Sequence, residues 1–326
     1  MKPTVWGILG PGKIARKFAR ALTMVEGARL GAIASRDAAR AAAFAKEHGA
    51  ERTWLHYEEL ASDPGIDAVY IATPHGFHAE HSLLCLQQGK GVLCEKPMAL
   101  SALQVGAMIE ASRIHQAFLM EAMWTRFLPL TREVLALVAS GRIGTVKYVR
   151  ADFGFLAPFN ETSRLYDLRL GGGSLLDIGI YPLYLCLQLL GEPDGIVAAG
   201  RLSPTGSDET CHALLQYAHG ATAVVSSTLA CQTSLTAEIA GTEGMIHIPG
   251  PWYRNDRFEW NRTGEAVQQV QLEPMVNGFE YQIREAMECM EQGRIESLML
   301  PHSFSLLMSR TMDEIRRQIG VVYPGE

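Results

Sequence analysis

Residues 5–15 read Val-Trp-Gly-Ile-Leu-Gly-Pro-Gly-Lys-Ile-Ala, a short apolar run that ends in the pattern Gly10-x-Gly12-x-x-Ala15. Apolar side chains then recur at helical spacing, so the order is strand, glycine-rich turn and helix. Gly10 suits the tight turn, Gly12 lets the backbone approach a pyrophosphate, and the small Ala15 lets helix and strand pack closely. In isolation, a glycine-rich turn that holds nothing would look the same. Its place at the head of alternating strands and helices favours a dinucleotide site.

Two further features belong to the same expected site. The helix that begins at Lys13 and Ile14 would turn its unpaired N–H groups toward the phosphates. At the end of the second strand, where NAD-specific sites place an acid for the ribose 2′-hydroxyl, the chain reads Ser35-Arg36-Asp37. The Arg36 guanidinium and the Ser35 hydroxyl suit a 2′-phosphate, which predicts a preference for NADP. In the alternative interpretation Arg36 is a solvated turn residue, and Asp37 accepts the 2′-hydroxyl or caps the next helix.

The composition is that of a globular protein, since 48% of the 326 residues are hydrophobic and 20% are charged. This length favours two domains, each with its own core. The formal net charge of −6 and the lack of a basic run argue against nucleic-acid binding. The six cysteines include no C-x-x-C pair, the first apolar run breaks at Gly10, and no apolar stretch reaches the roughly 20 residues that span a bilayer. We therefore expect a cytoplasmic protein with reduced cysteines.

The pattern of elements changes near residue 120. Before it, short apolar strands alternate with helices, which indicates a parallel sheet with right-handed crossovers. After it, β segments separated by turn pairs indicate a mostly antiparallel sheet. The expected early strands are 4–9, 29–34, 68–72, 91–94 and 118–120, with helices at 13–24, 37–47, 78–88 and 101–115. The expected later strands are 145–155, 196–202, 212–217, 221–229, 235–241, 245–248, 257–260 and 266–272, with helices at 126–140, 178–190, 278–292 and 303–319. The fold class is therefore α/β: a Rossmann domain over residues 1–121 and an α+β domain with a large, mostly antiparallel sheet over 122–326.

Three motifs resemble those of the Gfo/Idh/MocA oxidoreductases, and the first of them is the N-terminal fingerprint. The second combines Thr-Pro-His-Gly-Phe-His at 73–78, after one expected strand, with Glu-Lys-Pro at 95–97, after the next. The third, at 171–181, reads Gly-Gly-Gly-Ser-Leu-Leu-Asp-Ile-Gly-Ile-Tyr and resembles G-G-G-x-L-x-D-x-G-x-[HY]. The resemblance spans essentially the whole chain. Within the family, Glu-Ala-Met-Trp-Thr-Arg-Phe at 121–127 is most similar to the branch of dimeric dihydrodiol dehydrogenases and NADP-dependent D-xylose dehydrogenases.

The resemblance implies an NADP-dependent dehydrogenase, with NAD as the other cofactor, that transfers hydride between the nicotinamide and a carbinol carbon of a vicinal diol or sugar. Together with the residue patterns, it assigns cofactor binding to Gly10, Gly12, Lys13, Ile14, Ala15, Ser35, Arg36, Thr73, Pro74, His75, His78, Glu95, Lys96 and Trp124. It assigns substrate binding to Lys96, Trp124, Phe153, Asp177, Tyr181, Trp252 and Phe279. For each of these aromatic walls except the tyrosine, ordinary core packing is the alternative. A homodimer or dimer of dimers is expected through an exposed sheet face with apolar alternation over Ala221–Leu229 and Leu235–Ile239.

Lys96 is the first catalytic candidate. Pro97 biases it away from α geometry, so its side chain is expected at the carboxyl end of a parallel strand, where open α/β sheets bind ligands. A cation there can hold a substrate hydroxyl and stabilise the alkoxide that develops during oxidation. The alternative is a solvated loop lysine.

Tyr181 and Asp177, the other catalytic candidates, are four residues apart and would share one face of a helix. Family members with His at position 181 use it as the acid–base group. A phenol has an ordinary pKa near 10, so Tyr181 would need the charge of Lys96 to exchange a proton near neutrality.

Two structural interpretations of the same segment stay open. Ser174 to Asp177 spells a helix capping box, which would make Asp177 a cap. Pro182 fits badly inside a helix that begins at Ser174, because it lacks an N–H. A helix that begins nearer Gly179 would leave Asp177 just ahead of it.

Two questions remain: whether the histidines form a metal site, and which other functions fit the sequence. His75, His78 and His81 are spaced by three, but no cysteine or carboxylate completes a ligand set, so no metal is expected and His78 is placed beside the nicotinamide ribose. Other sugar or inositol dehydrogenases or reductases of the family are one alternative function. A non-catalytic NADP-binding regulator is another, against which the intact Lys96, Asp177 and Tyr181 argue. The fold does not identify the substrate or the physiological direction.

Overall fold

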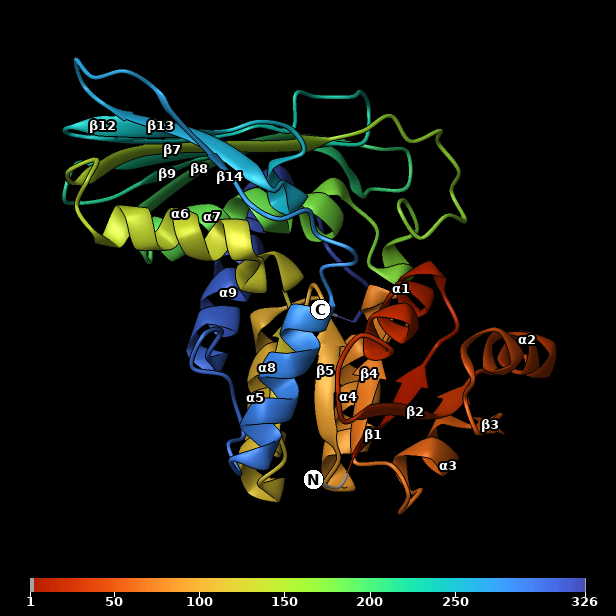
Figure 1. Ribbon diagram of the computed structural model, residues 1–326. Coiled ribbons are helices and arrows are strands. Elements are labelled where there is room, and N and C mark those ends of the chain that lie inside the picture. Colours follow the sequence, from red (N-terminus) through yellow and green to blue (C-terminus); the bar gives the residue numbers. More distant parts are fainter. Residues whose placement is uncertain (1–2, 326) are drawn as a thin grey trace. The chain divides into compact units, whose positions relative to one another are not determined.

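The computed structural model describes residues 3–325, which form two compact units (Figure 1). The first unit contains the chain up to Trp124 together with Val276–Leu306, and the second contains Thr125–Met275 and the chain from Leu307 onward. Helix α8 (Glu280–Glu291) packs on α1 (Lys13–Leu22) within the first unit. The expected domains, 1–121 and 122–326, assign this returning segment to the second part of the chain, because a sequence pattern does not reveal which early helix a late one contacts.

A six-stranded parallel sheet in the order β3-β2-β1-β4-β5-β6 forms the first unit. Its strands are β1 (Thr4–Leu9), β2 (Ala28–Ala34), β3 (Arg52–Trp54), β4 (Ala68–Ile71), β5 (Gly91–Glu95) and β6 (Leu119–Ala122). The connecting elements are α1, α2 (Ala38–His48), α3 (Tyr57–Ala61), the short η1 (His75–Phe77), α4 (His78–Gln87) and α5 (Ala102–His115). The strand order reverses between β1 and β4, and doubly wound sheets bind ligands at such a reversal. The predicted Rossmann arrangement is confirmed.

Local sequence explains most of these elements. Strands β4 and β5 are buried over their full length, as expected for central parallel strands that read as continuous apolar runs. Asp37 caps α2 by accepting the N–H of Arg40, and Ser101 caps α5 by accepting the N–H of Gln104. Strand β3 and helix α3 were not predicted, because elements of three and five residues carry too short a pattern.

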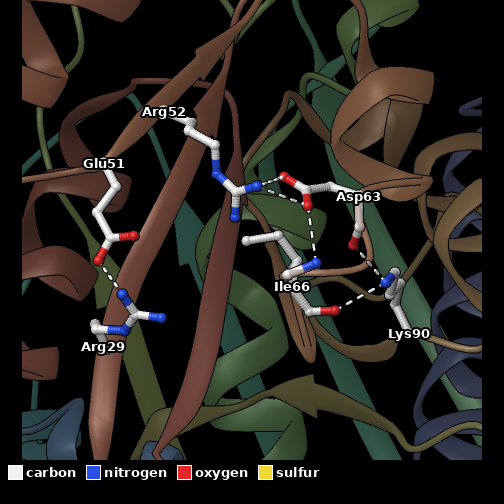
Figure 2. A network of polar contacts seen from close by, with 7 residues as sticks. Arg29, Glu51, Arg52, Asp63, Ile66 and Lys90 are labelled. Atoms are coloured by element: carbon white, nitrogen blue, oxygen red, sulfur yellow. Dashed lines mark hydrogen bonds and ion pairs between the residues drawn. The ribbon is translucent and has the colours of Figure 1, made fainter.

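Charged side chains form ion pairs and hydrogen bonds that hold the loops at the amino-terminal ends of these strands (Figure 2). Arg52 donates to the buried carboxylate of Asp63 at 2.8 Å. The Lys90 amine donates to two carbonyl oxygens of the same loop at 2.7 and 2.8 Å. Arg29 also pairs with Glu51, but exposed pairs contribute little to stability, so the buried Asp63 is the centre of this network.

The second unit is built on an eight-stranded sheet in the order β14-β13-β12-β11-β7-β10-β9-β8. All neighbours are antiparallel except β7 and β10, which are parallel. The strands are β7 (Val146–Gly154), β8 (Gly195–Leu202), β9 (Asp208–Gln216), β10 (Thr222–Thr228), β11 (Ala237–Gly241), β12 (Gly244–Ile248), β13 (Arg257–Arg262) and β14 (Gln268–Gln271). The helical elements of this part of the chain are η2 (Trp124–Phe127), α6 (Pro129–Ala139), η3 (Leu168–Leu170), η4 (Leu175–Gly179), α7 (Ile180–Leu190), η5 (Trp252–Arg254) and α9 (His302–Ile319), of which η2 and α9 each begin in the first unit. The predicted, mostly antiparallel sheet is confirmed.

The two faces of this sheet differ. Helices α6 and α7 lie along one face (Figure 1), and α7 packs on β7 and β10. Ala223, Val225 and Ile239 are fully buried. Val197, Leu214 and Val224 are neighbours in register on the opposite face, where Figure 1 draws no helix of the described chain, and Val197 is 59% exposed.

The sequence analysis placed the apolar residues of 221–229 and 235–239 on the exposed face of the sheet, and for most of them that placement was wrong. Most apolar members of 221–229 and 235–239, among them Ala223, Val225 and Ile239, point to the buried side, whereas Val224 and the polar neighbours point outward. Side chains alternate along a strand, so the pattern shows that two faces differ without showing which face a helix covers.

The stretch Leu168–Leu190 is long and apolar enough to cross a bilayer by length and composition, which corrects the expectation that no stretch reaches that length. In the structure, 83% of its most apolar window is buried. Its apolar character is thus accounted for by packing inside the second unit. Of the six cysteines, all are free thiols and all but Cys231 are buried.

Candidate active site

The turn between β1 and α1 has the geometry that the fingerprint predicts. Gly10 has a φ of +92°, and a Cβ on it would lie 3.0 Å from a carbonyl oxygen beyond β4. Gly12 precedes α1 without a side-chain cap, and the first turn, which holds Lys13 and Ile14, contains no acidic residue. A Cβ on Gly12 would contact nothing closer than 3.9 Å, so the space before the helix start is open. The buried Ala15 completes a cradle that fits a pyrophosphate.

A pocket of about 260 Å³ adjoins the carboxyl ends of β2 and β4. Its lining residues are Arg36, Leu55, His56, Tyr57, Glu58, Thr73, Pro74, Phe77, Glu80 and His81. The guanidinium carbon of Arg36 lies 6.0 Å from the centre of the Phe77 ring. Ser35 is buried beside it and accepts the N–H of Asp37 at 3.2 Å. Since the Asp37 carboxylate accepts the Arg40 N–H at 3.0 Å, it acts as a helix cap.

His78 joins two turns of the first unit. It is fully buried, and its ring nitrogens lie 2.8 Å from the Thr73 carbonyl oxygen and 2.7 Å from that of Pro97. His81 Nδ1 lies 2.9 Å from the Thr73 hydroxyl. Burial lowers the pKa of His78 to about 4, and burial together with the charge of Arg36 lowers the pKa of His81 to about 4. Both are therefore neutral at physiological pH and act as polar supports.

The other residues of this histidine motif lie nearby. Pro74 precedes η1, and the half-buried His75 opens it, with its ring 5.5 Å from that of His78. Among residues 3–325, no group of three His, Cys, Asp or Glu side chains is arranged to hold a metal ion.

Lys96 follows β5 directly, at the carboxyl edge of the sheet, and is half-buried. Its N–H donates to the Glu95 carboxylate at 3.3 Å, and its peptide bond to Pro97 is cis. Glu95 is buried and also accepts the Tyr70 phenol. Burial raises the pKa of Glu95, while the ammonium group of Lys96 opposes that rise. A buried acid therefore supports the lysine from the strand end.

Trp124 and Phe279, expected as walls of the substrate pocket, come together in the first unit. Their ring centres are 5.2 Å apart, and both side chains are buried. The Lys17 ammonium lies 3.7 Å from the Trp124 ring centre and 4.2 Å from that of Phe279. Sequence reasoning missed Lys17, because nothing in its spacing links a residue of α1 to an aromatic pair so far along the chain.

The segment of the third motif begins with a π-helical turn, η4, that passes into α7 at Ile180. The Ile180 N–H reaches the Leu175 carbonyl, a bond over five residues. This wider turn accommodates Pro182 near the start of α7, and such turns are frequent at functional sites. Asp177 lies in the π turn, and the buried Tyr181 lies in the first turn of α7.

Asp177 pairs with Arg164, which the sequence did not single out. One guanidinium nitrogen lies 2.9 Å and the other 3.5 Å from the two carboxylate oxygens. The Asp177 side chain is 8% exposed, while that of Arg164 is 56% exposed. The loop that carries Arg164 has no periodic pattern, so the sequence gives no sign that its arginine meets the motif.

A different acid, Asp208, holds the start of this segment. Its Oδ2 accepts the Ser174 hydroxyl and the Leu175 N–H, both at 2.7 Å. The capping-box interpretation of Asp177 was therefore wrong, since the side chain of Ser174 bonds to Asp208 and makes no cap. Burial raises the pKa of Asp208 to about 6.

Three aromatic rings cluster beside the tyrosine. Phe153 stacks on Tyr253 with ring centres 4.2 Å apart, and Tyr181 lies 5.5 Å from each. The neighbouring Trp252 is buried, and its indole N–H donates to the Asp152 carbonyl at 3.0 Å. The sequence analysis singled out Trp252, but the ring that stacks on Phe153 and lies beside Tyr181 is that of its neighbour Tyr253.

Comparison with known proteins identifies the family to which this fold and site belong. Residues 5–123 match the model of the oxidoreductase family with an NAD-binding Rossmann fold, and residues 131–247 match that of the GFO/IDH/MocA C-terminal domain. The chain belongs to the Gfo/Idh/MocA oxidoreductase family. It is 37% identical to the trans-1,2-dihydrobenzene-1,2-diol dehydrogenase of Xenopus laevis, over 98% of this chain and 99% of that protein. The human enzyme of the same name is 34% identical over 98% of both chains.

Solved structures agree with this assignment. A 3-ketoreductase from Actinomadura kijaniata, in complex with NADP and TDP-benzene, superposes with a TM-score of 0.88 at 27% identity, covering 97% of this chain and 98% of that one. An aldose-aldose oxidoreductase from Caulobacter crescentus, complexed with glycerol, gives 0.88 at 26% identity, covering 97% of both chains. The predicted family is confirmed, and the chain is an NAD(P)-dependent oxidoreductase.

Proposed function

We propose that this oxidoreductase acts on a carbinol carbon of a vicinal diol or a sugar, with NADP as its preferred cofactor. The observation that carries the proposal is the position of Lys96 at the carboxyl edge of a parallel sheet, on a turn held by buried side chains. The bound nicotinamide supplies or takes up the hydride, and the protein manages the proton and the charge on oxygen.

Each candidate residue has one task in this proposal. The ammonium group of Lys96 holds the carbinol oxygen and stabilises the developing alkoxide. Tyr181 exchanges the hydroxyl proton, as the residue at the acid–base position of the family motif. Asp177 accepts a hydrogen bond from a neighbouring substrate hydroxyl. Its pairing with Arg164 orients its carboxylate. Trp124, Phe279, Phe153 and Tyr253 are the candidate apolar walls; Trp252 supports Tyr253.

The preference for NADP rests on Arg36. Asp37, the acid that could accept a ribose 2′-hydroxyl, is used as the cap of α2. Arg36 and Ser35 therefore remain as the donors for a 2′-phosphate beside the pocket of 260 Å³. Thr73, Pro74, His75, His78 and Glu95 support the nicotinamide half of the cofactor in this proposal.

We also propose a homodimer in the cytoplasm. The open face of the eight-stranded sheet presents the exposed apolar side chains of Val197, Leu214 and Met245. The same face carries an ion pair between Arg150 and Glu238 at 3.0 Å. A twofold interface joins the same surface patch of both subunits, so an exposed apolar patch on this face favours a second copy of this chain as the partner. The free thiols suit a reducing compartment.

A sugar reductase or sugar dehydrogenase is the second candidate function. The structural similarity to the 3-ketoreductase and the aldose-aldose oxidoreductase favours it. The test is therefore a panel of trans-dihydrodiols, pentoses, hexoses and inositols, each assayed for NADP⁺ reduction with the wild type and with Lys96→Met. Turnover that depends on Lys96 supports the proposal. Tight NADPH binding without turnover of any panel member would instead indicate a regulator.

A further inference from the structure

The three residues 96–98 form a turn, here named the lysine turn, whose backbone is held by side chains from three elements. Glu95 accepts the N–H of its first residue at 3.3 Å, and the ring of His78 contacts the carbonyl of its second at 2.7 Å. Glu121 accepts the N–H of the third residue at 3.0 Å, and the Cys94 thiol donates to the carbonyl of that residue at 3.5 Å. The backbone that presents Lys96 is thus fixed from several sides.

Glu121 differs from the other supports because it comes from the next strand. It lies on β6, in register with Cys94 of β5, and its side chain is almost completely buried. A carboxyl group in such a position costs free energy unless its oxygens are bonded. No role in the proposed function is assigned to it, and its contact is with the residue two places after Lys96.

We propose that Glu121 is a positioning residue, which fixes the lysine turn by accepting the Met98 N–H and thereby orients the amine of Lys96. This inference rests on the catalytic role proposed for Lys96. A charge-assisted bond to a backbone N–H is stronger than a neutral one, so the carboxylate holds the turn better than its protonated form.

The groups around Glu121 determine when it is charged. Lys96, Glu95 and Cys94 face it from β5 and the lysine turn, and Ser305 faces it from α9. Burial raises the pKa of Glu121 to about 7, while the Ser305 hydroxyl, the Met98 N–H and the Lys96 ammonium limit the rise. As the pH rises through 7, Glu121 loses its proton, so the turn is held more firmly and kcat should rise.

Three variants separate this role from a general loss of stability. Glu121→Gln keeps an acceptor for the Met98 N–H but cannot ionise, and Glu121→Ala removes the acceptor. Asp63→Asn is the matched control, because Asp63 is also a buried acid of the first unit that accepts a backbone N–H, that of Gly65 at 2.8 Å. It lies at the opposite, amino-terminal ends of the strands (Figure 2).

The readouts are hydrogen exchange at the Met98 amide and the pH dependence of kcat and KM. In Glu121→Ala, loss of one hydrogen bond should speed Met98 exchange by about tenfold or more and lower kcat by about tenfold, with KM for NADP⁺ changed less than about threefold. In Glu121→Gln, the protection of Met98 should persist, and the rise of kcat near pH 7 should disappear. Asp63→Asn should leave both the Met98 exchange and the pH profile as in the wild type.

The proposal is overturned if Glu121→Ala leaves Met98 exchange and kcat unchanged, if Glu121→Gln retains the rise near pH 7, or if Asp63→Asn alters kcat as Glu121→Ala does. Lys96→Met distinguishes this failure from that of the proposed function. If Lys96→Met keeps wild-type kcat, the role of Lys96 has failed and the positioning role fails with it. If Lys96→Met is inactive but Glu121→Ala behaves as wild type, the positioning role alone has failed.

Discussion

Replacing Asp208 by Asn changes a carboxylate that holds the start of the π turn in the second unit. Asp208 is fully buried, so solvent does not weaken its interactions. Its Oδ2 accepts the Ser174 hydroxyl and the Leu175 N–H. The Asn side chain retains one oxygen for these donors, cannot ionise, and places an amide N–H group where the second carboxylate oxygen was. The pH dependence of the variant's stability therefore isolates the contribution of the buried charge.

The magnitude follows from the pKa of Asp208, which burial raises from the usual 3.8 to about 6. The folded state then holds this proton more tightly than the unfolded state does. The stabilisation is complete below pH 3.8 and is lost as the pH rises through 6. At ~1.4 kcal/mol per pH unit, the free energy of unfolding falls by about 3 kcal/mol over this window in the wild type. Asp208→Asn lacks this fall.

Urea unfolding of both proteins between pH 4 and pH 7.5 measures the difference. A buried amide N–H without a partner adds a constant cost of about 1–3 kcal/mol, so the slope with pH is the signature and the offset is not. Asp167→Asn is a control of opposite sign: hydrogen bonding from Arg169 lowers the pKa of Asp167, which therefore stabilises the fold at higher pH. Parallel curves for wild type and Asp208→Asn would refute this reasoning.

Three further outcomes are expected. Catalytic efficiency with NADP⁺ should exceed that with NAD⁺ by about tenfold or more, and Arg36→Ala should remove most of that ratio; equal efficiencies in the wild type would contradict the assignment. Arg164→Gln removes the guanidinium group that orients the poorly exposed Asp177 carboxylate, so kcat/KM for the diol or sugar should fall by about tenfold while the Kd for NADPH, measured by fluorescence, stays the same. Light scattering at micromolar concentration should give a dimer, and Val197→Glu with Leu214→Glu should give a monomer; a monomeric wild type would exclude the proposed interface.

Much of the fold was readable because local pattern and global arrangement agree. The apolar runs of β1, β4 and β5 and the helices between them carry strong periodic signals, and Gly10 is required by its positive φ. The predictions of secondary structure and of the buried face failed where the sequence pattern is very short or fits both faces of a sheet equally well. Strand β3 has three residues, and the alternation in β10 and β11 fits either face of the sheet.

For the candidate site as well, residues in sequence motifs could be predicted and their partners could not. Lys96, Asp177 and Tyr181 stand in motifs and could be named as candidates from the sequence, whereas the residues that bond to them could not. Arg164 meets the third motif from the irregular loop before it, and Asp208 meets it from β9, more than thirty residues farther along the chain. Such partners are chosen by three-dimensional packing, and a single sequence contains no trace of the pairing.

The most direct test of the account is kcat for Lys96→Met, Tyr181→Phe and the double variant, measured beside the Kd for NADPH. Each single variant should lose about a hundredfold or more in kcat, and the double variant little more, because groups that serve one transition state are not additive. NADPH binding should persist, since we propose that the phosphates bind at the turn Gly10–Ala15, which neither substitution changes. A Lys96→Met enzyme that binds NADPH and turns over at the wild-type rate would contradict the account.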